Sequence, residues 1–227
     1  MLLALFPSLC RAFSRSPTKA EIICRNYQPT RKIFREFPMR TFIAIEIPAP
    51  VKTALAQLQA ELRQTGADVG WTNPENIHLT LRFLGEVEEA RLTELKRLCG
   101  EIAAECPSFT LRLKDTGYFP NAKQPRVLWA GLAGEVSLAQ ELQQRLEAGL
   151  TALGFAPEDK RFKPHLTIGR VKSGKNLRQL VAKLEMYSLP ELSFAVGEIV
   201  LLKSDLHPAG ARYTPLVKAA LRNRPAD

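Results

Sequence analysis

Apolar residues recur at two different periods along the chain from residue 39 onward. Four segments repeat them every three or four positions, which gives a helix one apolar face. We therefore predict helices over residues 50–64, 88–106, 136–153 and 177–186. Shorter segments are alternating or continuously apolar, which is typical of strands. These predicted strands are residues 41–47, 77–84, 109–113, 127–132, 165–171, 192–202 and 213–218.

The order of these elements indicates the fold class. Several predicted strands follow one another without a helix between them, which favours an α+β fold with antiparallel sheets over a doubly wound parallel sheet. The chain contains neither a GxGxxG nor a GxxxxGK[ST] loop, so a nucleotide cradle of either kind is not expected.

Residues 1–38 lack a sustained pattern of this kind. They hold seven basic and two acidic side chains, and thus contribute +5 to a formal net charge of +9. Their apolar start precedes the basic residues and lacks a small-residue cleavage site, which argues against a secretory signal. The composition of this segment fits an organelle transit peptide. It also fits an extension that is disordered or that precedes the true start of the protein. We favour the extension because Met39 leads directly into a predicted strand, and we predict a single domain over residues 39–227.

Composition narrows the class of protein. Hydrophobic residues make up 45% of the chain and charged residues 24%, as in ordinary globular proteins. No run approaches the roughly 18 apolar residues that a membrane span needs, so we expect no membrane insertion. The four cysteines form no CxxC pair and have no histidine at zinc-binding spacing, which predicts reduced thiols, a cytoplasmic location and no metal. The basic charge fits either a nucleic-acid partner or a solvated surface.

Two of the three histidines open the same tetrapeptide, HLTL at residues 78–81 and HLTI at residues 165–168. Both motifs lie on predicted strands, where residues i and i+2 face the same side. Each motif therefore presents an imidazole and a hydroxyl on one surface. Two such arms across a groove would hold a phosphodiester between a general base and a general acid, without a metal. The alternative is a pair of core histidines that bond to the backbone.

Four segments carry a resemblance to a known family. They are RTFIAIEIP, NIHLTLRFLGEV, GYFPNAKQPRVLWAGL and FKPHLTIGRV, within residues 39–222. The chain resembles the 2H phosphoesterase superfamily, and within it the bacterial RNA 2′,3′-cyclic phosphodiesterases, formerly described as 2′-5′ RNA ligases. The resemblance implies a bilobal α+β fold with two antiparallel sheets facing a central groove and helices outside.

The resemblance also implies a reaction, in which a 2′,3′-cyclic phosphate at an RNA 3′ end opens to a 2′-phosphate. By motif, His165 is the proton acceptor and His78 the proton donor, although the symmetry of the motifs leaves the reverse assignment open. Thr80 and Thr167 are the expected phosphate-binding residues. Weak reverse 2′-5′ ligation is implied as a side activity. We expect an RNA substrate, no cofactor and a monomer, since one chain supplies both arms.

Other groove residues follow from the strand pattern and the neighbouring loops. Arg82 shares the alternation of His78 and Thr80, which predicts a place in the groove, against the alternative of a solvent-facing arginine. Arg170 follows the second motif at a position that is often basic in the family that the chain resembles, so the resemblance makes it a candidate for contact with the phosphate. Under strict alternation it points away from His165, unless the strand bulges at Gly169.

Loop residues complete the set of candidates. Phe119 is a candidate for stacking on a base, with packing as the alternative. Arg126 and Lys123 are candidates for contact with the RNA backbone, with a solvated loop as the alternative. We assign Trp71 and Trp129 to packing and His207 to a surface loop.

Two other function classes fit the same motifs. One is a 2H enzyme with a different substrate, such as a cyclic nucleotide, an ADP-ribose cyclic phosphate or a 2′-5′ oligonucleotide. The other is a non-catalytic RNA-binding module on the same fold, which loss of a motif residue would indicate. Both histidines and both threonines are present.

Overall fold

The computed structural model describes residues 38–208 and 210–224, and the predictions made for residues 1–37 lie outside this range. The described part contains four α-helices, each close to a predicted one, and in each the predicted apolar stripe supplies buried side chains. They are α2 (Ala49–Arg63), α3 (Leu92–Glu105), α4 (Val136–Ala152) and α5 (Leu177–Met186). None of the described helices is long and apolar enough to cross a membrane.

The described strands form one nine-stranded sheet in which all strand pairings are antiparallel. The order across the sheet is β7-β4-β5-β6-β3-β1-β8-β9, and the short β2 pairs with β6. The strands are β1 (Met39–Glu46), β2 (Val69–Trp71), β3 (His78–Val87), β4 (Phe109–Phe119), β5 (Val127–Gly134), β6 (His165–Val171), β7 (Ser193–Val196), β8 (Glu198–His207) and β9 (Gly210–Ala220).

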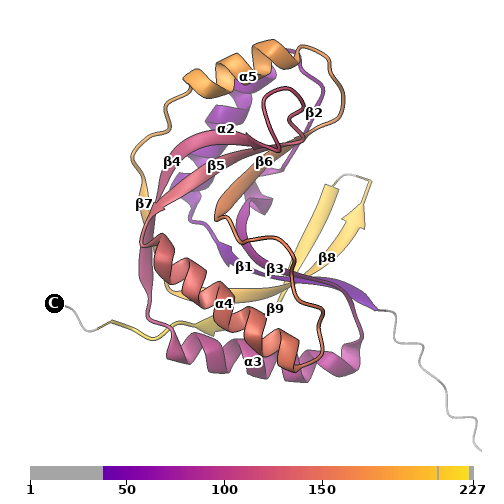
Figure 1. The fold of residues 1–227 in the computed structure, drawn as a ribbon, viewed down its shortest axis with the longest axis vertical. Helices are drawn as coiled ribbons and strands as arrows, with labels where there is room; N and C mark the ends of the chain where they lie inside the picture. Colours follow the sequence, from indigo (N-terminus) through magenta and orange to yellow (C-terminus); the bar gives the residue numbers. More distant parts are fainter. Residues whose placement is uncertain (1–37, 209, 225–227) are drawn as a thin grey trace, which may run out of the picture. The chain divides into compact units, whose positions relative to one another are not determined.

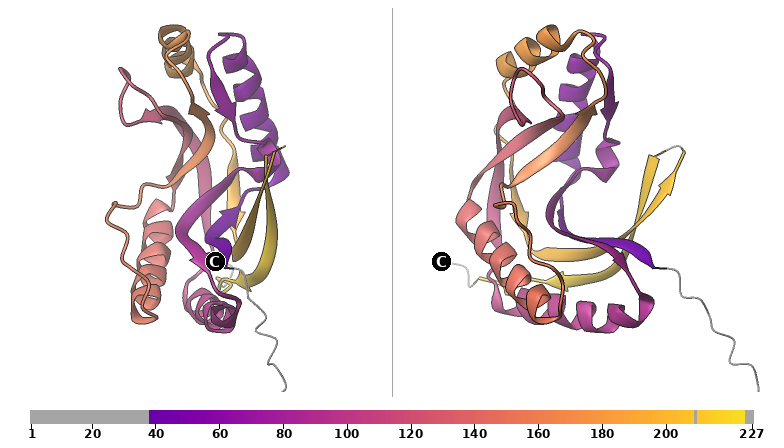
Figure 2. Two further views of the ribbon diagram at one scale, coloured as in Figure 1. Left: turned by 90° about the vertical axis from the view of Figure 1, so that its right-hand side faces the viewer. Right: turned by 45° about the vertical axis from the view of Figure 1, so that its right-hand side comes forward.

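The sheet consists of two halves that meet at a narrow joint. Strands β3 and β6 pair at one position, Leu79 with Leu166, whereas the strands within each half pair along several residues. The sheet curls, and α3 and α4 lie outside one half while α2 and α5 lie outside the other (Figures 1 and 2). The expected α+β fold, with antiparallel strands and helices outside, is therefore confirmed, and the two expected sheets are the two halves of one sheet joined by β3 and β6.

The structure corrects two details of the predicted strands. The segment predicted as one strand over residues 192–202 is divided at Gly197 into β7 and β8, which belong to different halves of the sheet. Strand β2 was not predicted, because three residues are too few to show a period.

Candidate active site

The two HxTx motifs open the two strands that join the halves of the sheet. Continuing the register of Leu79 and Leu166 sets His78 opposite Thr167 and Thr80 opposite His165. All four polar side chains are partly exposed on one face. The residues behind them are buried in the core: Leu79, Leu81, Leu166 and Ile168. The motifs are thus related by a local two-fold axis, and the predicted sharing of one face is confirmed.

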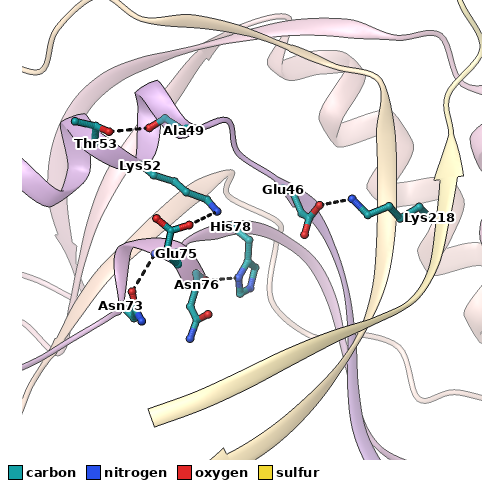
Figure 3. A network of polar contacts seen from close by, with 9 residues as sticks. All are labelled: Glu46, Ala49, Lys52, Thr53, Asn73, Glu75, Asn76, His78 and Lys218. Carbon is teal, nitrogen blue, oxygen red and sulfur yellow. Dashed lines mark hydrogen bonds and ion pairs between the residues drawn. The ribbon is translucent and has the colours of Figure 1, made fainter. Parts of the chain in front are cut away.

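Each imidazole is oriented by the same backbone contact. The Nδ1 atom of His78 lies 2.8 Å from the carbonyl oxygen of Asn76 (Figure 3). The Nδ1 atom of His165 lies 2.6 Å from the carbonyl oxygen of Lys163. A carbonyl oxygen only accepts hydrogen bonds, so each Nδ1 donates its proton. In the neutral ring the Nε2 atom of each histidine then carries the lone pair, ready to accept a proton.

His78 lies in an aromatic environment next to a carboxylate. Phe42 stacks on its ring with centroids 4.7 Å apart, and Tyr213 meets it edge-on at 5.4 Å. Burial lowers the pKa of His78, while the Asn76 carbonyl and the negative charge of Glu46 act in the opposite direction. Glu46 faces His78 across the β1–β3 pairing, where Lys218 Nζ binds its carboxylate at 2.7 Å (Figure 3).

His165 has a different electrostatic environment. Phe119 meets its ring edge-on at 5.2 Å and packs in turn on Trp129. Burial lowers the pKa of His165, the Lys163 carbonyl opposes this, and the positive charge of Arg170 lowers the pKa further. The nearest charges therefore act in opposite senses on the two histidines: Glu46 opposes the lowering of the His78 pKa by burial, whereas Arg170 adds to the lowering of the His165 pKa.

A β-bulge at the fourth residue of the first motif redirects Arg82. Ala44 pairs with Thr80 and Ile43 pairs with Arg82, so Leu81 is the extra residue of β3. A bulge of this kind breaks the alternation of faces. The expectation that Arg82 shares the face of His78 is therefore wrong.

Arg82 lies instead on the helix-covered face of the sheet. Its Nε atom is 2.9 Å from a carboxylate oxygen of Glu147 on α4, and its Nη1 atom is 3.2 Å from Glu158. The guanidinium also donates to the backbone carbonyls of Phe83 and Ala156. These contacts give Arg82 a role in stabilising the fold and place its side chain outside the groove.

The second motif has a bulge at the matching position, but here the bulge turns the following arginine toward the site. Trp129 pairs with Thr167 and Leu128 pairs with Gly169, so Ile168 is the extra residue of β6. Beyond this bulge Arg170 is exposed on the side of Trp129 and Thr167, so the bulge anticipated near Gly169 turns it toward His165.

A buried glutamine forms a hydrogen bond to the backbone of this second bulge. Gln59 on α2 is 2% exposed, and its Nε2 atom donates to the carbonyl oxygens of Ile168 and Thr72, both at 2.7 Å. Gly169 is required beside the bulge, because a Cβ there would lie 2.8 Å from Val69 Cγ1. The Gln59 contacts fix the backbone from which Thr167 and Arg170 project.

The remaining candidates lie on the hairpin between β4 and β5. Phe119 ends β4 beside His165, and Lys163 Nζ lies 5.8 Å from the centroid of its ring. Arg126 is exposed and its backbone N–H donates to the Phe119 carbonyl at 2.6 Å. Lys123 is exposed in the same turn. The structure thus brings Phe119 next to a histidine and leaves the two basic side chains at the surface.

Sequence reasoning missed a cavity of about 750 Å³ next to His78. Its wall includes Asn76, Tyr213, Arg212 and Trp71, and also His207 of the predicted surface loop. Trp71 packs on the core, as predicted, but also lines this cavity. Together with Arg170 these residues come from three separate stretches of the chain, so no local motif signals them.

Cysteines and metal ligands contribute nothing further to this site. Cys99 and Cys106 are buried free thiols, and burial raises the pKa of Cys99 to about 12. Among residues 38–208 and 210–224 no three His, Cys, Asp or Glu side chains gather as a metal site.

Comparison with known proteins decides the family. The family model described as LigT like Phosphoesterase matches residues 45–129 and 133–213, which include both HxTx motifs. The chain belongs to the LigT-like phosphoesterase family. A relative from Thermotoga maritima named RNA 2′,3′-cyclic phosphodiesterase is 37% identical over 179 residues, covering 78% of this chain and 93% of the relative.

Solved LigT-like structures share the same architecture. The protein TT0787 of Thermus thermophilus superposes with a TM-score of 0.68 at 33% identity, covering 82% of this chain and 99% of that one. E. coli LigT complexed with 3′-AMP superposes with a TM-score of 0.63 at 29% identity, covering 82% of this chain and 98% of that one.

Proposed function

We propose that this LigT-like protein hydrolyses 2′,3′-cyclic phosphate at RNA 3′ ends to a 2′-phosphomonoester, by metal-independent acid–base catalysis with two histidines. The observation that carries the proposal is the local two-fold arrangement of His78, Thr80, His165 and Thr167 on adjacent strands. The name of the Thermotoga maritima relative and the 3′-AMP complex of E. coli LigT support this substrate class.

The geometry suggests which bond each group serves. The neutral His165 takes a proton from water at Nε2, and the water oxygen forms a new bond to phosphorus as the bond from phosphorus to the ribose O3′ breaks. His78, protonated at both nitrogens, gives its Nε2 proton to the departing O3′. Both protonation states of His78 keep the Nδ1–H bond to the Asn76 carbonyl, so the ring need not turn during the reaction.

The neighbouring charges support this assignment of acid and base. Glu46 stabilises the imidazolium of His78, whereas Arg170 disfavours an imidazolium at His165. Thr80 and Thr167 would donate hydrogen bonds to the non-bridging phosphate oxygens as negative charge develops on them. With a 5′-hydroxyl in place of water as the nucleophile, the same steps would join that hydroxyl to the cyclic end as the bond to O3′ breaks, which gives a 2′-5′ linkage as a slow side reaction.

Product analysis tests the proposal. A short RNA with a 2′,3′-cyclic phosphate is incubated with the purified chain in EDTA, and the product is compared with authentic 2′- and 3′-phosphate standards by chromatography and mass spectrometry. We expect the 2′-phosphate, with the double variant His78→Gln/His165→Gln as a control for contaminating nuclease. A 3′-phosphate product, loss of activity in EDTA or equal activity of the double variant would each refute the proposal.

A further inference from the structure

The cavity beside His78 is lined by neighbours of both motifs, although none of the four motif histidines and threonines lines it. Asn76, whose carbonyl orients His78, forms part of its wall, as does Tyr213, whose ring meets His78 edge-on. Arg170, three residues beyond Thr167 on β6, lines it as well. The hydrolysis step needs only the phosphate and its two ester oxygens, so this cavity of about 750 Å³ has no role in it.

The side chains of this cavity are of the kinds that bind nucleotides. Trp71 is partly exposed in the wall, and the Arg63 guanidinium lies over one face of its ring, 5.1 Å from the centroid. Arg170 and Arg212 line the cavity, and neither forms an ion pair within the described residues. Aromatic rings stack on bases, and guanidinium groups bind phosphodiesters through paired N–H donors.

The polarity of RNA restricts what such a cavity can hold. A cyclic phosphate closes the 3′ end, so the chain continues from the reacting nucleotide only through its 5′ phosphodiester. A second nucleotide next to the catalytic centre must therefore be the preceding one. The volume lies within the range of roughly 300–1,000 Å³ that is usual for pockets that bind small molecules.

We propose that this cavity is a subsite for the nucleotide that precedes the cyclic-phosphate nucleotide. Arg170 and Arg212 bind the phosphodiester between the two nucleotides, and Trp71 stacks on the base of the preceding one. The proposal rests on the proposed function and extends it, because it makes an RNA end a better substrate than a free cyclic nucleotide.

The test compares two substrates that differ by one nucleotide. The kcat/KM values for 2′,3′-cyclic AMP and for the dinucleotide ApA with a 2′,3′-cyclic phosphate are measured for the wild type, Arg212→Gln, Trp71→Ala and Trp71→Phe. For the wild type we expect the dinucleotide to be preferred by about tenfold or more, as one stacked base and one phosphate contact would give. Arg212→Gln and Trp71→Ala should each lower this preference about fivefold or more, and Trp71→Phe less.

Arg178→Gln is the matched control, since Arg178 is an exposed arginine on α5 that does not line this cavity. It should keep the wild-type preference. If Trp71→Ala melts early, Arg212→Gln still decides, because Arg212 is exposed on the β9 strand. A wild type without preference, or an Arg212→Gln variant that keeps it, would overturn the subsite. A wild type that hydrolyses neither substrate would overturn the proposed function and the subsite with it.

Discussion

The two HxTx arms have the same backbone geometry and different neighbours. Each places a histidine and a threonine on one face, bonds Nδ1 to the carbonyl two residues earlier, and bulges at the fourth motif residue. Beyond the bulge of the first arm, Arg82 points to the helix-covered face and forms ion pairs there. Beyond the bulge of the second arm, Arg170 points toward the site. In the mechanism that we propose, repetition thus supplies two equivalent proton-transfer groups, and the residues around them make one an acid and the other a base.

Removing either imidazole should cause the largest loss of activity among the changes considered for the two arms. We expect His78→Gln and His165→Gln each to lower kcat by about 10²–10⁴-fold, the usual contribution of one acid or base. The double variant should be little worse than the poorer single variant, because both groups act in one step. Single-turnover rates on cyclic-ended RNA measure this, with circular dichroism melting to verify folding. A single variant with full activity would rule out the paired mechanism.

The two arginines that follow the bulges should show opposite defects. Arg82→Gln leaves the largely buried Glu147 carboxylate poorly paired, which should lower the free energy of unfolding by about 2–3 kcal/mol with little change in kcat. Arg170→Gln should lower kcat/KM about tenfold without changing stability, since Arg170 is exposed and a phosphate contact is lost. Urea unfolding and initial rates on both variants test this. A loss of activity without a loss of stability in Arg82→Gln would contradict the structural role.

Gln59 donates a hydrogen bond to the Ile168 carbonyl in the second bulge and makes no such bond to the first bulge. Its loss should therefore affect only the arm that carries His165. Gln59→Leu removes two donated hydrogen bonds and leaves the Thr72 carbonyl without its partner, which should cost about 1–2 kcal/mol of stability. Gln57→Leu is the matched control, because Gln57 lies on the same helix and makes neither of these bonds. Thermal melts of the two variants give the comparison, and equal melting temperatures would argue against the support of the bulge by Gln59.

The smallest effects should appear in the pH dependence, and they test which histidine is the acid. Activity rises with pH as the base loses its proton and falls as the acid loses its own. Arg170 lowers the pKa of His165, so Arg170→Gln should move the acidic limb to higher pH. Glu46 raises the pKa of His78, so Glu46→Gln should move the alkaline limb to lower pH.

Both substitutions should therefore narrow the pH profile of kcat/KM. With the roles exchanged, Glu46→Gln would instead move the acidic limb to lower pH and Arg170→Gln the alkaline limb to higher pH. Profiles of the two variants that widen would accordingly make His78 the base and His165 the acid. The two limbs are properties of the coupled pair, so direction of movement is the informative quantity.

The elements that the sequence predicted well are those with local signals. The leucine stripes of the helices and the two HxTx motifs show their periodicity within a few residues. In the structure the stripes are buried on helices and the motifs lie on strands, as predicted. The placements of Arg82 and Arg170 depend on bulges that form when β3 pairs with β1 and β6 with β5, which alternation within one strand does not reveal. The cavity is built by Trp71, Arg170 and Tyr213 from distant segments, so only tertiary structure brings it together.

The division of the chain at Gly197 has a consequence for how the enzyme is made. Strand β7 completes the half that carries His165, and β8 and β9 then cross to complete the half that carries His78. Neither half is a contiguous stretch, so cutting the gene between them would not yield two independently folding pieces. During synthesis, the half that carries His78 lacks β8 and β9 until every strand of the other half has been made. Such non-local pairing predicts slow folding, with activity appearing only after β8 and β9 have paired.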